Sequence, residues 1–158
     1  MGIRLAPMSP DEYQKFYNKS IQEYAYNQVA VGNWRAQDAV SLARQELNEM
    51  LPQGLETPNA YLSNILNDTD VPVGMMWFYI DEGRPQKTAV LLDFFLFPAF
   101  RNQTLAMEVL SVFEKGVRAV GVSRVELQVF GHKSDEIRLY TENAYKQTMV
   151  LFAKDLVE

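Results

Sequence analysis

The spacing of apolar residues divides the first third of the chain into two helical segments. After a short apolar stretch at residues 3–5, the run Ser9-Pro10-Asp11-Glu12 precedes apolar positions that recur every three or four residues. The serine can cap a helix, the proline suits its first position and the glutamate completes a capping box. This pattern predicts a helix that Gly32 ends, and a second helix over about residues 35–50. The apolar face of the second helix is formed by Ala39, Ala43, Leu47 and Met50.

The middle of the chain is different, because its apolar stretches are rich in aromatic and branched residues. They cover residues 60–66, 73–80 and 87–97, and turn-forming sequences separate them at 67–70 and 81–85. Stretches of this length and composition predict three antiparallel strands in a meander.

The last third alternates helical and extended patterns. A helix is predicted from about Thr104, a strand over 124–130, a short helix over 134–143 and a final strand over 146–155. The order is βααβββαβαβ, with residues 3–5 as the first strand. It describes an α/β (α+β) fold with a mixed, mostly antiparallel sheet flanked by helices, and the 158 residues suit one domain.

Composition narrows the chemistry that this fold can carry. The chain has no cysteine and one histidine, His132. This composition excludes a thiol nucleophile, a cysteine metal site and a multi-histidine metal site. The start lacks the apolar run of a signal peptide, and no stretch suits a membrane span, so we expect a cytoplasmic protein. The net charge of −5 argues against non-specific nucleic-acid binding and mildly favours a cationic substrate.

The junction before the helix near residue 104 is the first candidate binding site. It reads Phe100-Arg101-Asn102-Gln103-Thr104-Leu105-Ala106. A helix N-terminus offers unpaired N–H groups and a positive dipole end, which suit a phosphate, and the arginine adds charge. The alternative is an ordinary loop in which Thr104 caps its own helix. The local sequence leaves both interpretations open.

A second candidate runs from Val129-Phe130-Gly131-His132 through Leu139-Tyr140 to Tyr145. Together with the loop, it resembles the GNAT family of N-acetyltransferases. Relatives often read Val-Phe-Gly-His-Asn-x-x-Ala-x-x-Leu-Tyr-x-x-x-Gly-Phe/Tyr here, and Arg/Gln-x-x-Gly-x-Gly/Ala in the loop. The resemblance covers essentially the whole chain. It departs at Asn102 and Thr104, where Gly is common, at Lys133 for Asn, at Glu136 for Ala and at Ala144 for Gly.

The resemblance implies acetyl-CoA as co-substrate, direct attack of an amine on the thioester, and no covalent enzyme intermediate. It also implies that the tyrosine matching Tyr140 is the general acid, since a phenol with a pKa of about 10 can protonate the departing thiolate. Spacing alone favours a core aromatic for Tyr140, and the match to the family motif favours the functional role. The cofactor-binding residues expected from the resemblance are Leu96, Arg101, Asn102, Gln103, Thr104, Leu105, Ala106 and Lys133.

Asp93 is the only acidic residue within the apolar stretch from Thr88 to Phe97. A carboxylate there is costly unless it is paired or faces a cavity. The period of two places it on the same face as Phe95, the position where many relatives carry Glu. It is therefore a candidate base or amine-binding group, and the alternative is a structural carboxylate.

These observations predict an N-acetyltransferase that acts on a primary amine of a small molecule or peptide, with no nucleic-acid or membrane partner. A homodimer stays open. Because the loop departs from the family pattern, the alternatives are a non-catalytic acyl-CoA sensor and an interaction module that keeps the fold without a ligand.

Overall fold

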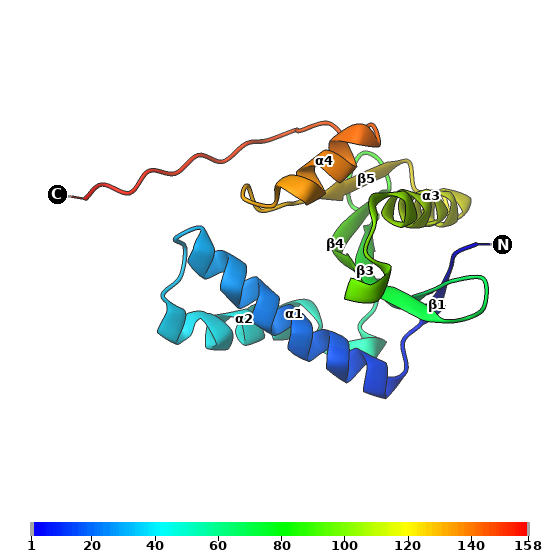
Figure 1. Cartoon of the computed structure of the whole chain (residues 1–158), viewed down its shortest axis with the longest axis horizontal. Helices are drawn as coiled ribbons and strands as arrows, with labels where there is room; N and C mark the ends of the chain where they lie inside the picture. The colour runs from blue at the N-terminus through cyan, green and yellow to red at the C-terminus, as the bar shows by residue number, and fades with distance from the viewer. Residues whose placement is uncertain (1, 158) are drawn as a thin grey trace.

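A five-stranded sheet forms the centre of the protein, seen in a computed structural model that describes residues 2–157 (Figure 1). The strands are β1 (Arg4–Pro7), β2 (Ala60–Leu66), β3 (Pro72–Asp81), β4 (Thr88–Leu96) and β5 (Arg124–Leu127). They lie in the sheet in chain order. The first four pair antiparallel, which confirms the predicted meander, and β5 pairs parallel to β4.

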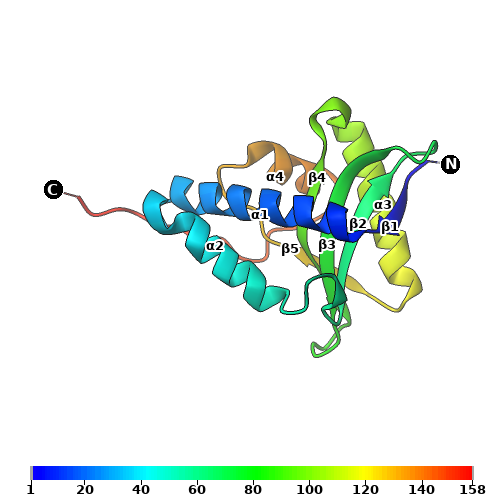
Figure 2. The same cartoon turned by 90° about the horizontal axis from the view of Figure 1, so that it is seen from below.

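Helices cover both faces of this sheet. Helices α1 (Pro10–Ala30) and α2 (Ala36–Met50) lie on one face, and α3 (Gln103–Ala119) and α4 (Ser134–Glu142) lie on the other (Figures 1 and 2). Two short 3-10 helices, η1 (Gly54–Glu56) and η2 (Pro98–Phe100), precede β2 and α3. The predicted capping box of α1 is present, since the Ser9 hydroxyl accepts from the Glu12 N–H and the Glu12 carboxylate accepts from the Ser9 N–H.

The two helical layers enclose two hydrophobic cores. The first packs α3 and α4 on the sheet around Val109, Leu110 and Phe113. The second packs α1 and α2 on the other face around Phe16 and Trp77. Burial on both faces explains why β3 is almost continuously apolar rather than alternating. Most of the predicted face of α2 is buried, but Met50 is 43% exposed because the helix ends there, and Leu51 enters the core instead.

Strand β4 departs from regular pairing in the middle of its length. Trp77 pairs with Asp93 and Phe78 pairs with Leu91, so Leu92 is an extra residue in a β-bulge. Pairing of β4 with β5 covers only Thr88–Leu91, which leaves the second half of β4 without a neighbour on that side. Bulges re-aim side chains and terminate pairing. Here the bulge coincides with the point where β4 and β5 separate.

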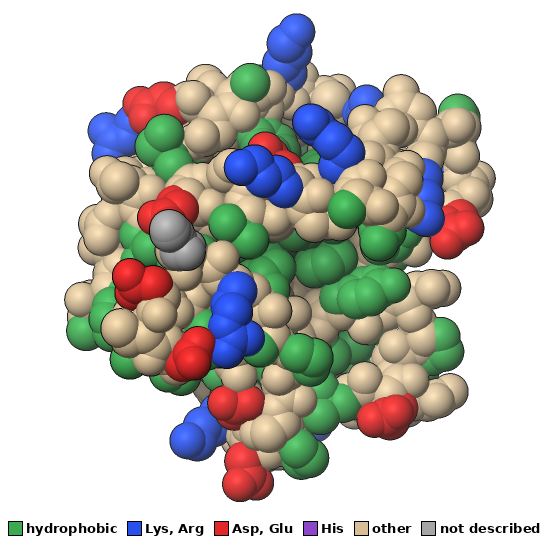
Figure 3. Space-filling model, turned by 90° about the vertical axis from the view of Figure 1, so that its right-hand side faces the viewer, with side chains coloured by type: hydrophobic (Ala, Val, Ile, Leu, Met, Phe, Trp, Pro, Cys, Tyr) green, Lys and Arg blue, Asp and Glu red, His purple; other side chains and the backbone are tan. Residues whose placement is uncertain are grey.

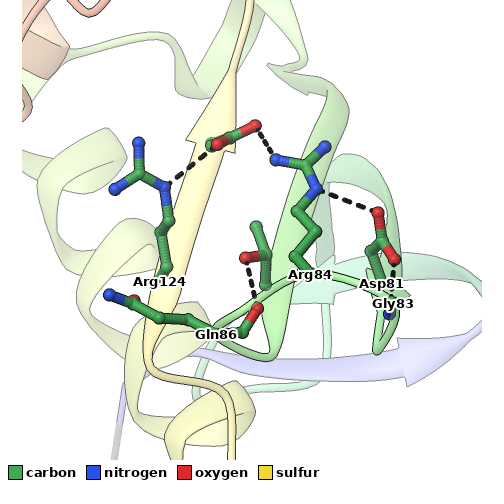
Figure 4. Close-up of polar contacts among 7 residues, drawn as sticks. Asp81, Gly83, Arg84, Gln86 and Arg124 are labelled. Atoms are coloured by element: carbon green, nitrogen blue, oxygen red, sulfur yellow. Dashed lines mark hydrogen bonds and ion pairs between the residues drawn. The ribbon is translucent and has the colours of Figure 1, made fainter.

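The opposite end of β5 is tied to the β3–β4 hairpin by charged groups. The Arg84 guanidinium donates to the carboxylates of Asp81 and Glu126, and Arg124 also donates to Glu126 (Figure 4). Glu126 and Arg124 are two residues apart on β5, so they share the face that Arg84 approaches. The network fixes the start of β5 against the hairpin.

The predicted last strand over residues 146–155 is not part of the sheet. Among the described residues, 146–157 form no helix or strand and run away from α4 as an extended segment (Figures 1 and 2). The prediction of a final strand over residues 146–155 is therefore wrong, although the fold class and the other elements are confirmed with boundaries shifted by a few residues at most.

Charge is mixed on the face of the molecule that Figure 3 shows, where acidic and basic side chains are interspersed around a hydrophobic recess. Among the helices of residues 2–157, none combines the length and apolar character that crossing a bilayer requires.

Candidate active site

Asp93 lies on the face of β4 that α1 covers. The bulge interrupts the alternation of side chains, so the consecutive residues Leu92 and Asp93 share this face. The Ser20 hydroxyl of α1 donates a hydrogen bond to its carboxylate (Oγ to Oδ2, 2.8 Å). Phe95 follows on the same face, as the period of two predicted, and stacks on Phe16 with Lys19 over its ring. Ser20 is buried, so the pair lies inside the interface between α1 and the sheet.

The surroundings of Asp93 favour its neutral form. Burial raises the pKa of this carboxyl to about 6 from an ordinary value of 3.8, the bond from Ser20 opposes that rise, and the negative charges of Glu23 and Glu136 add to it. A carboxyl with a pKa near the physiological range can accept a proton and release it again. The positive charge of Lys19 acts in the opposite direction and lowers this pKa.

Tyr140 comes from the other core, on α4. It is 8% exposed and packs edge-to-face with Tyr145 at 5.4 Å between ring centroids. Burial raises its pKa above the ordinary 10, with further contributions from the charges of Glu136 and Asp93. The phenol therefore stays protonated at neutral pH. Tyr140 and Asp93 lie on opposite faces of the sheet, and the Asp93 charge contributes to the raised pKa of Tyr140.

The start of α3 has a different cap from the one that the sequence suggested. The Asn102 side chain accepts from the Leu105 N–H (2.7 Å), so Asn102 is the N-cap and Thr104 lies within the first turn. The cap proposed for Thr104 is therefore wrong. Residues 101–104 are exposed, while Ala106 is buried and its N–H donates to the Asn102 carbonyl within the helix.

The loop before α3 is joined to the end of β4. The Arg101 guanidinium donates to the Leu96 carbonyl at 3.2 Å. This contact brings together the unpaired half of β4 and the N-terminus of α3, the two places where the sequence predicts cofactor contacts. An unpaired strand edge can hydrogen-bond an extended ligand, and a helix N-terminus can bind an anion.

The segment before α4 borders the same region. Lys133 precedes α4 and lies 3.7 Å from Glu136, measured between Nζ and Oε2. His132 Nε2 lies 2.9 Å from the Asn27 Oδ1 of α1, and Phe130 packs against Tyr24 of the same helix. These contacts join the segment after β5 to α1.

Comparison with known proteins decides the family. The model of the acetyltransferase (GNAT) family matches residues 22–145. The chain belongs to this family. The chain is similar to two Bacillus subtilis proteins, the uncharacterized N-acetyltransferases YycN and YdgE, each at 32% identity. The matches cover 99% of this chain in both cases, and 100% of YycN and 99% of YdgE.

Solved structures agree with the GNAT assignment. The crystal structure of the acetyltransferase YycN superposes with a TM-score of 0.95 at 30% identity over 99% of both chains. An acetyl transferase from Pyrococcus furiosus, 14% identical, covers 98% of this chain and 99% of its own with a TM-score of 0.66, and shows a shared fold.

The sequence analysis did not identify two residues that act on Asp93 or Tyr140. Ser20 lies four residues after Phe16 on the buried face of α1, and that spacing was the available signal that a polar side chain faces the sheet. Glu136 stands where relatives often carry Ala, so it was seen as a departure rather than as a charge that acts on Tyr140 and Asp93.

Proposed function

We propose that this GNAT acetyltransferase transfers an acetyl group from acetyl-CoA to a primary amine by direct attack. The amine nitrogen forms a bond to the thioester carbonyl carbon, the carbon–sulfur bond breaks, the amine loses a proton and the thiolate gains one. The observations that support the proposal are Asp93, which Ser20 holds on β4, the buried Tyr140 of α4, whose pKa the Asp93 charge helps to raise, and the half of β4 that lacks a neighbour on one side.

Asp93 binds the amine and accepts a proton from it. Its carboxylate form attracts an ammonium group, and its pKa of about 6 lets it take a proton from that group or from a water in contact with it. Ser20 orients the carboxylate by donating to one oxygen and leaves the other for the substrate. The negative charges of Glu23 and Glu136 strengthen the preference for a cationic acceptor.

Tyr140 donates its hydroxyl hydrogen toward the sulfur that departs. The raised pKa keeps the phenol protonated until negative charge develops on the sulfur. Among residues 2–157 the hydroxyl makes no hydrogen bond to a protein group, so it is available to a substrate atom. A proton donor positioned in this way accelerates a reaction by roughly 10²-fold to 10⁴-fold.

Acetyl-CoA would be held by Leu96 on the unpaired edge of β4, by Arg101, Asn102, Gln103, Thr104 and Leu105 at the start of α3, and by Lys133 through its charge. Ala106 would contribute by its small size, which lets the first turn of α3 pack closely on the sheet. The Leu105 N–H is engaged by the Asn102 side chain, so a phosphate that binds there must displace this cap. We expect a weaker diphosphate site than a glycine-rich loop provides.

The test combines binding with turnover. Isothermal calorimetry with acetyl-CoA should show one site, and acetyl-CoA at about 100 times its dissociation constant should stabilise the fold by about 2.7 kcal/mol. A panel of primary amines, assayed by release of free thiol, should contain at least one acceptor. Binding without turnover on any amine would favour the acyl-CoA sensor. Absence of binding at millimolar acetyl-CoA would refute both functions. A cytoplasmic location belongs to the same proposal.

A further inference from the structure

Helix α1 carries two buried polar side chains, Ser20 and Asn27, and each one contacts a different part of the proposed active site. Ser20 donates to Asp93 on β4. The Oδ1 of Asn27 lies 2.9 Å from the Nε2 of His132, which belongs to the segment between β5 and α4. Ser20 is 5% exposed and Asn27 is 8% exposed. A buried polar group without a partner is costly, so both hydrogen bonds matter for how α1 packs.

His132 reaches α1 from a tight turn at residues 130–133, called the linking turn below. The Lys133 N–H donates to the Phe130 carbonyl at 3.0 Å and closes this turn. Helix α4 begins at the next residue. Phe130 contacts α1 as well, since its ring centroid lies 6.2 Å from that of Tyr24. The linking turn is therefore attached to α1 by one hydrogen bond and one aromatic contact.

The spacing of the two buried polar residues determines where the two parts of the site attach to α1. Ser20 and Asn27 are seven positions apart, which is about two turns, so they share one face of the helix about 10 Å apart along its axis. Figure 2 shows α1 crossing the strands and continuing past β4 toward α4. Paired strands lie about 4.8 Å apart. The two attachment points on α1 are therefore about twice as far apart as two paired strands.

The chain after β5 would otherwise be suited to continue the strand. Its alternating pattern runs through Val125, Leu127 and Val129 and predicts a strand over residues 124–130, but pairing with β4 ends at Leu127. The free N–H and C=O groups on the second half of β4 are a template for such pairing. The contacts of the linking turn with α1 draw the chain away from β4 at this point. They explain why the strand ends earlier than its pattern predicts.

We propose that Asn27 and His132 are positioning residues, whose hydrogen bond holds the linking turn away from β4 so that the unpaired half of β4 stays open for acetyl-CoA. The inference rests on the proposed function for the identity of the ligand, whereas the place of the turn is a property of the fold. Helix α4 is held separately beyond its other end, where the Tyr145 hydroxyl donates to Glu114 at 2.6 Å. Loss of the Asn27–His132 bond should therefore weaken acetyl-CoA binding and leave proton donation by Tyr140 nearly intact.

The first test measures acetyl-CoA affinity by calorimetry and kcat by thiol release. Asn27→Leu keeps a side chain of similar size without the acceptor, and should weaken acetyl-CoA roughly tenfold or more with kcat within about threefold of wild type. His132→Leu should do the same. The double variant should be no worse than either single variant, because each removes the same bond. His132→Gln keeps an N–H donor and should retain wild-type affinity.

The matched control is Asn48→Leu, which removes the acceptor of the Tyr17 hydroxyl in the contact between α1 and α2. It loosens α1 at another point and should leave the affinity for acetyl-CoA unchanged. Wild-type affinity in both Asn27→Leu and His132→Leu would overturn the proposal. Losses that add in the double variant would overturn it as well, because the two residues would then act independently.

The second test does not depend on activity and uses the absence of cysteine from the chain. Nitroxide labels at Gln45→Cys on α2 and Ser134→Cys beside the linking turn report the separation of these positions by double electron–electron resonance. The distance distribution should be narrow with the native bond and with His132→Gln, and broader or shifted with Asn27→Leu. An unchanged distribution in Asn27→Leu would refute the inference. A wild type that does not bind acetyl-CoA would instead refute the proposed function, and the distance distribution would still decide whether this bond holds the turn.

Discussion

Replacing Asp93 by Asn separates the stability of the site from its chemistry. The amide has nearly the same shape as the carboxyl, and its oxygen can still accept the bond from Ser20. The change removes a group that is uncharged in the folded protein at low pH and charged at high pH. We therefore expect Asp93→Asn to stabilise the fold at neutral pH and to abolish most of the activity.

The magnitude follows from the pKa of Asp93, about 6 in the fold against an ordinary 3.8. Between these values the folded protein binds more protons than the unfolded chain, so the free energy of unfolding falls as pH rises. The cost is absent below pH 4 and complete above pH 6, and it amounts to about 3 kcal/mol. The amide NH₂ adds donors that lack partners, which costs about 1 kcal/mol. The net gain of Asp93→Asn is thus about 2 kcal/mol above pH 6, with a loss of about 1 kcal/mol near pH 4.

The assay is urea unfolding of both proteins between pH 4 and pH 8, read as the difference in unfolding free energy so that other groups cancel. Asp81→Asn is the control with the opposite sign, because hydrogen bonds from the Gly83 N–H and from Arg84 lower the pKa of Asp81. That variant should lose stability at neutral pH, and the loss should shrink as pH falls. A difference for Asp93→Asn that does not vary between pH 4 and pH 8 would refute the burial argument.

Five further substitutions test other parts of the site and fold. Tyr140→Phe should lower turnover by ~10²-fold with acetyl-CoA affinity nearly constant, and turnover within threefold of wild type would exclude the proton-donor role. Asn102→Gly should tighten CoA binding by about 1 kcal/mol in calorimetry, because it frees the Leu105 N–H, and weaker binding would mean that the amide itself contacts the ligand. Gly74→Ala should cost about 3 kcal/mol in urea unfolding, since its new carbon would lie 2.2 Å from the Phe95 carbonyl oxygen, whereas Gly116→Ala, with open space around it, should stabilise α3 by about 1 kcal/mol. Ala144→Gly should raise the unfolding free energy by about 1 kcal/mol by relieving the left-handed turn, and no gain would show that the turn carries no strain.

The parts of the fold that the sequence predicted are those with strong local signals. The capping box at Ser9 and the turn sequences between the three central strands placed helix and strand boundaries to within one or two residues. The final strand had an equally clear pattern, but a pattern describes what a segment can pair with and not where its partner lies. The segment is extended, as its pattern predicts, but it forms no strand of the sheet.

Two features of the site could not be predicted from the sequence and are seen only in the structure. The bulge at Leu92 depends on the register between β3 and β4, which the sequence of one strand does not determine. Without the bulge, Asp93 would be placed by simple alternation and its contact with Ser20, seventy-three positions earlier, would not be foreseen. Similarly, Asn102 and Thr104 are both capable caps, and the choice between them depends on where the chain leaves η2.

The separation of β4 from β5 is the feature of the fold on which the proposed function depends. Pairing stops after Leu91, so the end of β4 presents backbone groups without a neighbour, while the bulge next to it turns Asp93 toward α1. Tyr140 approaches the same split from α4 on the other face. Under the proposed function, a substrate bound in the split would meet Asp93 as proton acceptor on one side of the sheet and Tyr140 as proton donor on the other. Neither residue needs the other for its own position, because each is held by a separate core, so variants of one should leave the local structure of the other intact.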